Sequence, residues 1–375
     1  MGRRQFPTVL QALNRSHSPL RAVDPVRDRR IERIESLVAP IQLLDEVPLS
    51  DEQAQIVLRG RDQIHAVLDG ADDRLLVVVG PCSVHDVDAT LEYASRLGDR
   101  ARAWQRDLLV VMRVYFEKPR TTTGWKGLIN DPFLDGSGDV NAGLRIARKA
   151  LLGVLAQGIP VGCEFRDPIT PQYISDAVSW GAIGARTVES QIHRQLGSGL
   201  SMPVGFKNRT DGNVQVAVDA VRAAAVSHAF AGVDSDGTPA IFYTQGNRDC
   251  HIILRGGKRA PNYSPEAVAG SLAMLRAARL PERAMIDCSH DNSGKDPERQ
   301  ADVAADVGRQ LATGNRAIVG TMLESFLVAG RQDLGSGKLV YGQSITDACL
   351  GWEDTVELLD GLAASVRARR SAHAG

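Results

Sequence analysis

The chain has 375 residues, which is enough for one large domain with an appendage or for two ordinary domains. Hydrophobic residues make up 43% and charged residues 24% of it, proportions that exclude a disordered chain and are typical of a soluble globule. The formal net charge of -1 gives no reason to expect nucleic acid or an anionic membrane as the main partner. Any affinity for anions must come from local clusters of Arg and Lys.

The ends and the cysteines indicate a cytoplasmic protein. No apolar run approaches the roughly 18 to 20 residues of a membrane span. The opening MGRRQFPTVLQALNRSHSPLR is basic and lacks an apolar core, so it predicts a mobile tail, with an Arg-rich transit peptide as the alternative. The five cysteines are scattered without a C-x-x-C pair, which indicates a reducing compartment.

The first part of the chain differs in pattern from the rest. Apolar residues within 31–38 recur at helical spacing and predict a short amphipathic helix that begins at Asp28. Ser50 and Gln53 have the spacing of a capping box and predict the start of a second helix. We therefore expect residues 1–72 to form an N-terminal extension packed on a larger body.

From residue 73 to 375 short apolar runs alternate with helical stretches. We expect buried strands at LLVVVG, LLVVMRV, VGCEF, GAIGAR, PVGFKN, HIILRG, AMIDCS and AIVGTML. Helix starts are indicated by Thr170-Pro171, Ser264-Pro265 and Asp296-Pro297. About eight such units predict an α/β protein, a (β/α)8 TIM barrel. An open doubly wound sheet is the alternative, but no G-x-G-x-x-G follows the first strand and no Walker loop occurs.

Reactive side chains end every predicted strand. In chain order they are Cys82, Arg113, Glu164, Arg186, Lys207, Arg255, His290 and Glu324. Barrel enzymes build their active sites from the carboxyl ends of the strands and the loops that follow. One polar residue after a strand is ordinary, but eight reactive ones in succession predict an active site.

Two chemical types divide this set. Cys82, His290 and Glu324, together with Asp347 in a later loop, are metal-ligand types and predict a divalent Mn, Fe, Co or Zn ion. Taken one at a time, each has a structural explanation, such as a small buried cysteine or a hydrogen-bonded histidine. The second type is a set of cations, namely Arg113, Lys118, Arg120, Arg186, Lys207 and Arg255. They predict binding of phosphate or carboxylate groups, with surface ion pairing as the alternative.

Long motifs identify a family. The chain closely resembles the microbial type I alpha 3-deoxy-D-arabino-heptulosonate 7-phosphate (DAHP) synthases, which join phosphoenolpyruvate to erythrose 4-phosphate at the start of the shikimate pathway. The resemblance runs from about Arg74 to the C-terminus and rests on GPCSVHD, VMRVYFEKPRTTTGWKGLINDP, GAIGARTVESQIHR, MPVGFKNRTDG, HIILRGGKRAPNYS, MIDCSHDNSGKD and YGQSITDACLGWEDT.

The resemblance implies a role for each candidate residue. The family's metal ligands fall on Cys82, His290, Glu324 and Asp347. Its phosphoenolpyruvate contacts fall on Arg113, Lys118, Glu164, Arg186, Lys207 and Arg255. Its erythrose 4-phosphate contacts fall on Lys118, Arg120 and Thr121, and its catalytic groups on Lys118, Arg113, Glu164 and His290. C3 of phosphoenolpyruvate then attacks the metal-polarised aldehyde, water adds at C2, and inorganic phosphate leaves, with Lys118 as the expected proton donor.

The resemblance also implies regulation by an aromatic amino acid. Family members are commonly homodimers or homotetramers, and their effector pocket lies between the barrel and the N-terminal extension of a partner subunit. Its positions fall on Asp28, Gln172, Leu196, Leu200, Ser201, Phe230 and Gly232. Phenylalanine-sensing relatives usually carry Ser where this chain has Gly232, so we expect inhibition by tyrosine, whose hydroxyl needs room. A pocket that has lost its effector is the alternative.

The chain departs from the family pattern without losing a proposed ligand. It has about twenty extra residues before Asp28, Arg209 replaces a frequent Gly, and Thr123 replaces a usual Val. Two alternative functions remain. A related synthase makes 3-deoxy-D-manno-octulosonate 8-phosphate, but its second-substrate loop resembles KANR[ST]S, whereas this chain has KPRTT. A non-catalytic paralogue that senses aromatic amino acids would be expected to have lost ligands or cations.

Overall fold

The computed structural model describes residues 26–118, 124–335 and 337–373. The barrel strands and the segments between them are β1 (Leu75–Gly80), α3 (Val87–Trp104), β2 (Leu108–Arg113), α4 (Val140–Leu155), β3 (Val161–Glu164), α5 (Pro171–Ile174), η2 (Ser175–Ala177), β4 (Trp180–Ile183), α6 (Gln191–Gly199), β5 (Val204–Lys207), α7 (Gln215–Ala224), β8 (His251–Leu254), α8 (Pro265–Ala277), β9 (Ala284–Asp287), α9 (Arg299–Ala312), β10 (Ile318–Glu324) and α10 (Trp352–His373). Two helices precede them, α1 (Pro40–Glu46) and α2 (Asp51–Leu68), and four short strands are inserted, β6 (Ala229–Val233), β7 (Pro239–Tyr243), β11 (Val328–Arg331) and β12 (Gln343–Ser344).

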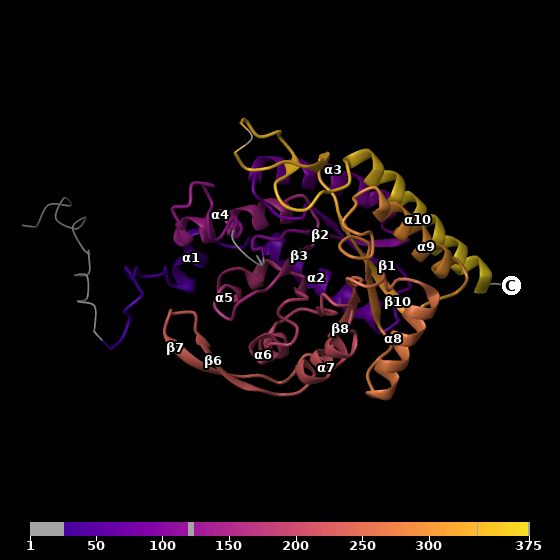
Figure 1. Cartoon of the computed structure of the whole chain (residues 1–375), viewed down its shortest axis with the longest axis horizontal. Coiled ribbons are helices and arrows are strands. Elements are labelled where there is room, and N and C mark those ends of the chain that lie inside the picture. The colour runs from indigo at the N-terminus through magenta and orange to yellow at the C-terminus, as the bar shows by residue number, and fades with distance from the viewer. Residues whose placement is uncertain (1–25, 119–123, 336, 374–375) are drawn as a thin grey trace, which may run out of the picture. The chain divides into compact units, whose positions relative to one another are not determined.

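Eight parallel strands close into a barrel in the order β1-β10-β9-β8-β5-β4-β3-β2, surrounded by helices (Figure 1). The chain forms strands at these places because each run is apolar enough to be buried on both faces, as in β1, where all six residues are buried. All eight apolar runs named above become barrel strands, so the predicted TIM barrel is confirmed and the open sheet is excluded.

Helix α2 closes one end of the barrel. Its buried residues Ile64, Val67 and Leu68 form one hydrophobic cluster with barrel residues that include Leu76, Trp180 and Met285. The capping box at the start of α2 is formed as expected, because the hydroxyl of Ser50 accepts from the backbone N–H of Gln53, 3.2 Å away. With this end filled by apolar side chains, the polar strand ends are left at the other end.

Two insertions extend the connections of the barrel. Strands β6 and β7 form an antiparallel hairpin between α7 and β8, seen below α6 and α7 in Figure 1. Strands β11 and β12 lie in the long connection from β10 to α10. In the described residues no helix is both long and apolar enough to cross a membrane.

The contacts divide the chain into two units, residues 1–38 and residues 39–375. Helices α1 and α2 therefore belong to the barrel unit. The predicted helix from Asp28 does not form, because residues 31–39 have no helical turns, and Ile34 is 69% exposed. A segment this short needs a surface on which to bury its apolar face before it gains helical stability. The predicted tail, residues 1–25, lies outside the described residues.

Two of the three predicted helix starts are correct. Helix α5 begins at Pro171 and α8 at Pro265, and the hydroxyl of Ser264 caps α8 by accepting from Ala267 N at 3.3 Å. The third was placed too early, since α9 begins at Arg299. There the carboxylate of Asp296 accepts instead from the backbone N–H of Glu298, which makes a local turn before the helix.

Candidate active site

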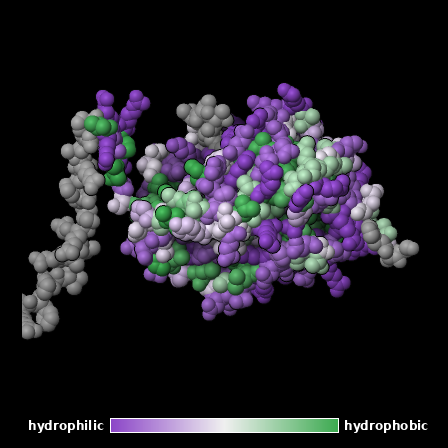
Figure 2. Space-filling view, turned by 90° about the horizontal axis from the view of Figure 1, so that it is seen from below, coloured by the Kyte–Doolittle hydropathy of each residue, from purple (hydrophilic) through white to green (hydrophobic). Residues whose placement is uncertain are grey.

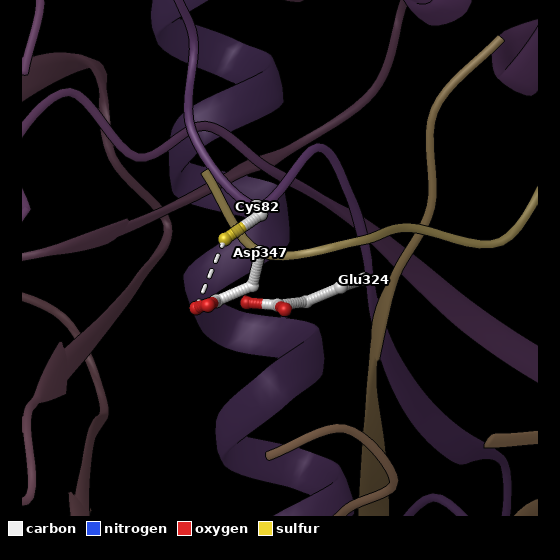
Figure 3. A group of neighbouring side chains, drawn as sticks. All are labelled: Cys82, Glu324 and Asp347. Atoms are coloured by element: carbon white, nitrogen blue, oxygen red, sulfur yellow. Dashed lines mark hydrogen bonds between the residues drawn. The ribbon is translucent and has the colours of Figure 1, made fainter. Parts of the chain in front are cut away.

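Three of the four predicted metal ligands gather at the carboxyl end of the barrel. Ligand atoms of Cys82, Glu324 and Asp347 all lie within 4.8 Å of one another. Cys82 follows β1, Glu324 ends β10, and Asp347 lies in the loop before α10 (Figure 3). The thiol of Cys82 donates to Oδ2 of Asp347 at 3.7 Å, and the two carboxylates lie side by side. Groups far apart in the chain thus form one compact set of sulfur and oxygen donors.

The fourth predicted ligand, His290, faces this group. Its Nε2 lies 3.9 Å from Oε1 of Glu324, while its Nδ1 lies 2.9 Å from Oδ2 of Asp287. A hydrogen bond at Nδ1 leaves Nε2 as the ligand atom, the arrangement found in metal sites where a carboxylate orients the histidine. His290 also has a positive φ of 57°, a strained conformation that is concentrated at functional sites. The donor set is therefore suited to a divalent transition metal ion.

The charges of these ligands depend on one another. Burial, aided by the charge of Glu324, raises the pKa of the Cys82 thiol to about 11. Burial also acts to raise the pKa of Glu324, but His290 and Arg113 outweigh it, so that pKa is lowered. The pKa of Asp347 is lowered in the same way, burial being outweighed by Lys118 and His290. The two carboxylates are therefore held in the charged form that a cation requires.

Two predicted substrate-binding cations border the metal ligands. Arg113 is 2% exposed, donates to Oε1 of Glu324 at 2.8 Å, and stacks over the ring of Tyr115 at 3.7 Å. Lys118 donates from Nζ to Sγ of Cys82 at 2.8 Å. Burial acts to lower the pKa of Lys118, but the charges of Cys82 and Glu324 outweigh it and raise that pKa. Both side chains are therefore cationic beside the candidate metal site, an arrangement that suits an anionic ligand.

Two further cations are paired with carboxylates that the sequence reasoning missed. Nζ of Lys207 lies 2.9 Å from Oδ2 of Asp287, and Arg255 is paired with Asp291. Lys207 and Arg255 are almost completely buried, so each needs a counter-charge when no substrate is bound. Asp287 is the last residue of β9, and its position at a strand end was a signal of the same kind that selected the other candidates.

A third missed residue is Gln300, in the first turn of α9. Its side chain is 1% exposed and forms hydrogen bonds with both the backbone N–H and the backbone C=O of Glu324. No sequence pattern singles out this glutamine, because the contact exists only when α9 folds back beside β10. It holds Glu324, a candidate metal ligand, by its backbone.

The other predicted residues have mixed outcomes. Glu164 ends β3, and its carboxylate lies close to the backbone of Gly184. A Cβ added at Gly184 would come within 2.6 Å of that carboxylate. Arg186 is exposed and has no hydrogen-bond partner among the described residues, so its role stays a prediction. Arg120 and Thr121 lie outside the described residues.

A separate cavity of about 440 Å³ contains most of the predicted effector positions. Five of them line it, namely Gln172, Leu196, Leu200, Ser201 and Phe230. Gly232 lies on β6 beside it, and a Cβ there would come within 2.6 Å of the ring of Phe242. Asp28 belongs to the other unit of the chain, so its place in the effector site stays a prediction.

The comparison with known proteins identifies the family. The model of the DAHP synthetase I family matches residues 46–360. The chain belongs to the DAHP synthetase I family. It is 57% identical to the Phe-sensitive phospho-2-dehydro-3-deoxyheptonate aldolase of Escherichia coli (strain K12), over 92% of this chain and 98% of the relative.

Further members of the family agree in fold and differ in regulation. The Trp-sensitive phospho-2-dehydro-3-deoxyheptonate aldolase of Salmonella typhi is 52% identical over 91% of this chain and 98% of its own length. The solved structure of phospho-2-dehydro-3-deoxyheptonate aldolase from Francisella tularensis SCHU S4 superposes with a TM-score of 0.89 at 49% identity, covering 90% of this chain and 99% of that chain. Relatives with different named effectors thus share half or more of this sequence, and family membership alone does not fix the effector.

Proposed function

We propose that this protein condenses phosphoenolpyruvate with D-erythrose 4-phosphate to give DAHP and inorganic phosphate, the first step of the shikimate pathway. The observation that carries the proposal is one arrangement at the barrel mouth. The cluster of Cys82, Glu324 and Asp347, faced by His290, is bordered by buried cations. Metal ligands and anion-binding cations side by side suit a reaction between two phosphorylated substrates, one of which carries an aldehyde.

A divalent metal ion bound by these four residues would supply Lewis-acid polarisation of the aldehyde oxygen. The remaining steps belong to this chain's own side chains. Arg113, Lys207 and Arg255 are buried cations that would bind the phosphate and carboxylate of phosphoenolpyruvate and hold C3 toward the aldehyde. In doing so they would exchange part of their bonding from carboxylate partners to substrate oxygens.

Lys118 is the proposed proton donor to the new alkoxide. Its Nζ lies 2.8 Å from the Cys82 sulfur, which places its charge beside the metal ligands. A cation here would favour the developing negative charge and then give up a proton to it. Turnover of a Lys118→Ala variant should fall by about 100-fold or more, in keeping with loss of general acid catalysis. Turnover close to that of the wild type would remove this role.

The reaction is tested with metal-stripped protein, phosphoenolpyruvate and erythrose 4-phosphate, with and without added Mn²⁺, by the loss of phosphoenolpyruvate absorbance. We expect turnover only with the metal. A Cys82→Ser variant should lose most of it, whereas Cys250→Ser, a buried cysteine outside the metal cluster, is the matched control and should retain it. Folded protein without turnover in any divalent metal would refute the proposal.

We also propose feedback inhibition by tyrosine at the cavity beside β6 and β7. Support comes from its lining, which combines Leu196, Leu200 and Phe230 with the polar Gln172 and Ser201, a mixture suited to an aromatic amino acid. The ring of Phe242 fills the space next to Gly232, so tyrosine's hydroxyl would require that ring to move. Initial rates with tyrosine, phenylalanine or tryptophan test this, and inhibition by phenylalanine but not tyrosine would contradict it.

A homodimer or homotetramer is part of the proposal. The outer face of the β6–β7 hairpin carries apolar side chains, among them Ile241, 64% exposed, and Tyr243, 80% exposed. Figure 2 views the molecule from the side on which this hairpin lies and shows hydrophobic residues among hydrophilic ones there. A hydrophobic two-stranded face is suited to burial against a second copy. Light scattering after size exclusion should show an oligomer, and Ile241→Asp should weaken it.

A further inference from the structure

One carboxylate oxygen joins the candidate metal site to the candidate substrate site. Oδ2 of Asp287 lies 2.9 Å from Nδ1 of His290 and 2.9 Å from Nζ of Lys207. Asp287 is completely buried. The resemblance assigns no role to Asp287, although it contacts one proposed metal ligand and one proposed phosphoenolpyruvate ligand.

The rest of the Asp287 side chain is held rigidly. Its other oxygen, Oδ1, accepts from the backbone N–H of Ser289 at 3.0 Å and from the Ser289 hydroxyl at 2.6 Å. Its backbone carbonyl accepts from Nδ2 of Asn292 at 2.8 Å. The carboxylate cannot turn away from His290 and Lys207 without breaking these bonds. The two donors therefore share one fixed acceptor.

We propose that Asp287 is a positioning residue that makes the metal ion and phosphoenolpyruvate bind cooperatively, an inference that rests on the function proposed above. A cation on Nε2 of His290 withdraws electron density from the ring and makes Nδ1–H a stronger donor to Oδ2. Oδ2 is then more fully neutralised by His290, and Lys207 has more of its charge free for a substrate anion. Conversely, an anion on Lys207 strengthens the bond between Oδ2 and Nδ1–H, which makes Nε2 a better ligand.

Such coupling must be reciprocal. If phosphoenolpyruvate tightens Mn²⁺ binding by some factor, Mn²⁺ tightens phosphoenolpyruvate binding by the same factor. Substitution of a residue that only stabilises the fold would lower the melting temperature and leave this factor unchanged. The ratio of the two Mn²⁺ dissociation constants, without and with phosphoenolpyruvate, is therefore the readout that separates positioning from stability.

The experiment uses the metal-stripped full-length protein and the electron paramagnetic resonance signal of free Mn²⁺. Titrations are made without and with saturating phosphoenolpyruvate, and no erythrose 4-phosphate is added, so no turnover occurs. In the wild type we expect phosphoenolpyruvate to tighten Mn²⁺ binding by roughly 5- to 150-fold. Asp287→Asn should weaken Mn²⁺ binding by roughly 10- to 100-fold and reduce the coupling factor at least threefold.

Asp291 supplies the matched control. It is paired with the buried Arg255, and its carboxylate forms no hydrogen bond or ion pair with the His290 ring among the described residues, so Asp291→Asn should change phosphoenolpyruvate binding through Arg255 and keep both the Mn²⁺ affinity and the coupling factor. Because Asp287→Asn leaves Lys207 buried without a full counter-charge, it can fail to fold, and Ser289→Ala then decides. That variant loses the hydroxyl bond to Oδ1 and the 2.7 Å contact of the same hydroxyl with Nδ1 of His290, keeps the carboxylate of Asp287, and should show a smaller decrease in the same factor.

The outcomes separate the two proposals. A wild-type coupling factor in the folded Asp287→Asn protein, or in Ser289→Ala where Asp287→Asn does not fold, overturns the role of Asp287 while turnover of the wild type stands. A wild-type protein that neither binds Mn²⁺ nor turns over refutes the proposed function instead. A decrease in the coupling factor in Asp291→Asn as large as in Asp287→Asn also overturns the inference, because the coupling would then not pass through the shared oxygen.

Discussion

The side chain of Gln300 offers a sharp test of how this site is held together. Its Oε1 accepts from the backbone N–H of Glu324 at 2.9 Å, and its Nε2 donates to the Glu324 carbonyl at 3.0 Å. The carbonyl has a second donor, the backbone N–H of Leu350 at 2.9 Å. Removal of the Gln300 amide would therefore leave the N–H of Glu324 without its side-chain partner, while the carbonyl keeps one.

The cost follows from these contacts. A buried N–H without a partner costs about 1–3 kcal/mol, and loss of the second hydrogen bond costs about 0.5–1.5 kcal/mol. Gln300→Met keeps the length of the side chain and avoids a cavity, so we expect it to lower the free energy of unfolding by about 2–4 kcal/mol. Gln300→Ala adds a cavity and should lower that free energy further.

Urea unfolding of the metal-free protein, followed by tryptophan fluorescence and checked for reversibility on dilution, measures the free energy. Mn²⁺ affinity is measured on the same proteins, and Gln300→Met should weaken it because the Glu324 backbone is no longer fixed. Gln310→Met is the matched control for the Mn²⁺ affinity. Gln310 also lies on α9, but its amide donates to the backbone carbonyl of Tyr263 and to Asp306, not to Glu324. A loss below about 0.5 kcal/mol in Gln300→Met, with unchanged Mn²⁺ affinity, would refute the reasoning, since a hydrogen bond contributes about that much or more.

Three further predictions concern other parts of the molecule. Burial and the charge of a neighbouring carboxylate raise the pKa of Glu117 to about 8, above its ordinary value of 4.5, so its contribution to stability is full below pH 4.5 and is lost as pH rises through 8. Glu117→Gln should therefore flatten the decrease in melting temperature between pH 6 and 9, and a slope equal to the wild type's would contradict this assignment. Gly232→Ser places a Cβ within 2.6 Å of the Phe242 ring, so it should change inhibition by aromatic amino acids while turnover without effector is retained; identical inhibition curves would show that the ring yields freely. Arg148 is 1% exposed and pairs with Asp176, whose side chain is 35% exposed, so Arg148→Ala should cost about 1.5–3 kcal/mol in urea unfolding, whereas Arg145→Ala, which breaks an exposed pair on the same helix, should cost at most about 1 kcal/mol.

The sequence by itself determined the barrel and the chemical types in its mouth. Each barrel strand is a continuous apolar run, and the regular alternation of strands and helices leaves few other topologies. The carboxyl ends of parallel strands must meet, so a list of strand ends was already a list of neighbours. That is why Cys82 and Glu324, 242 positions apart, were expected in one site and lie in one cluster.

Local sequence patterns gave wrong predictions where tertiary packing decides the structure. The apolar spacing of residues 31–38 predicted a helix that the chain does not form, because a short amphipathic segment has no helical stability without a surface to cover it. The Asp296-Pro297 pair predicted a helix start two residues early, because the aspartate caps a turn instead. The ring of Phe242 beside Gly232 could not be foreseen either, since it depends on the register of the hairpin.

Only the tertiary structure decided which partners hold the site residues. Asp287 between His290 and Lys207, and Gln300 on the Glu324 backbone, are contacts between segments whose spacing in sequence carries no signal. Hydrogen bonds depend on distances within a few tenths of an ångström, whereas hydrophobic pattern fixes only which face of a strand or helix is buried. The candidate residues for the chemistry follow from the pattern, and the residues that hold them in place follow from the packing.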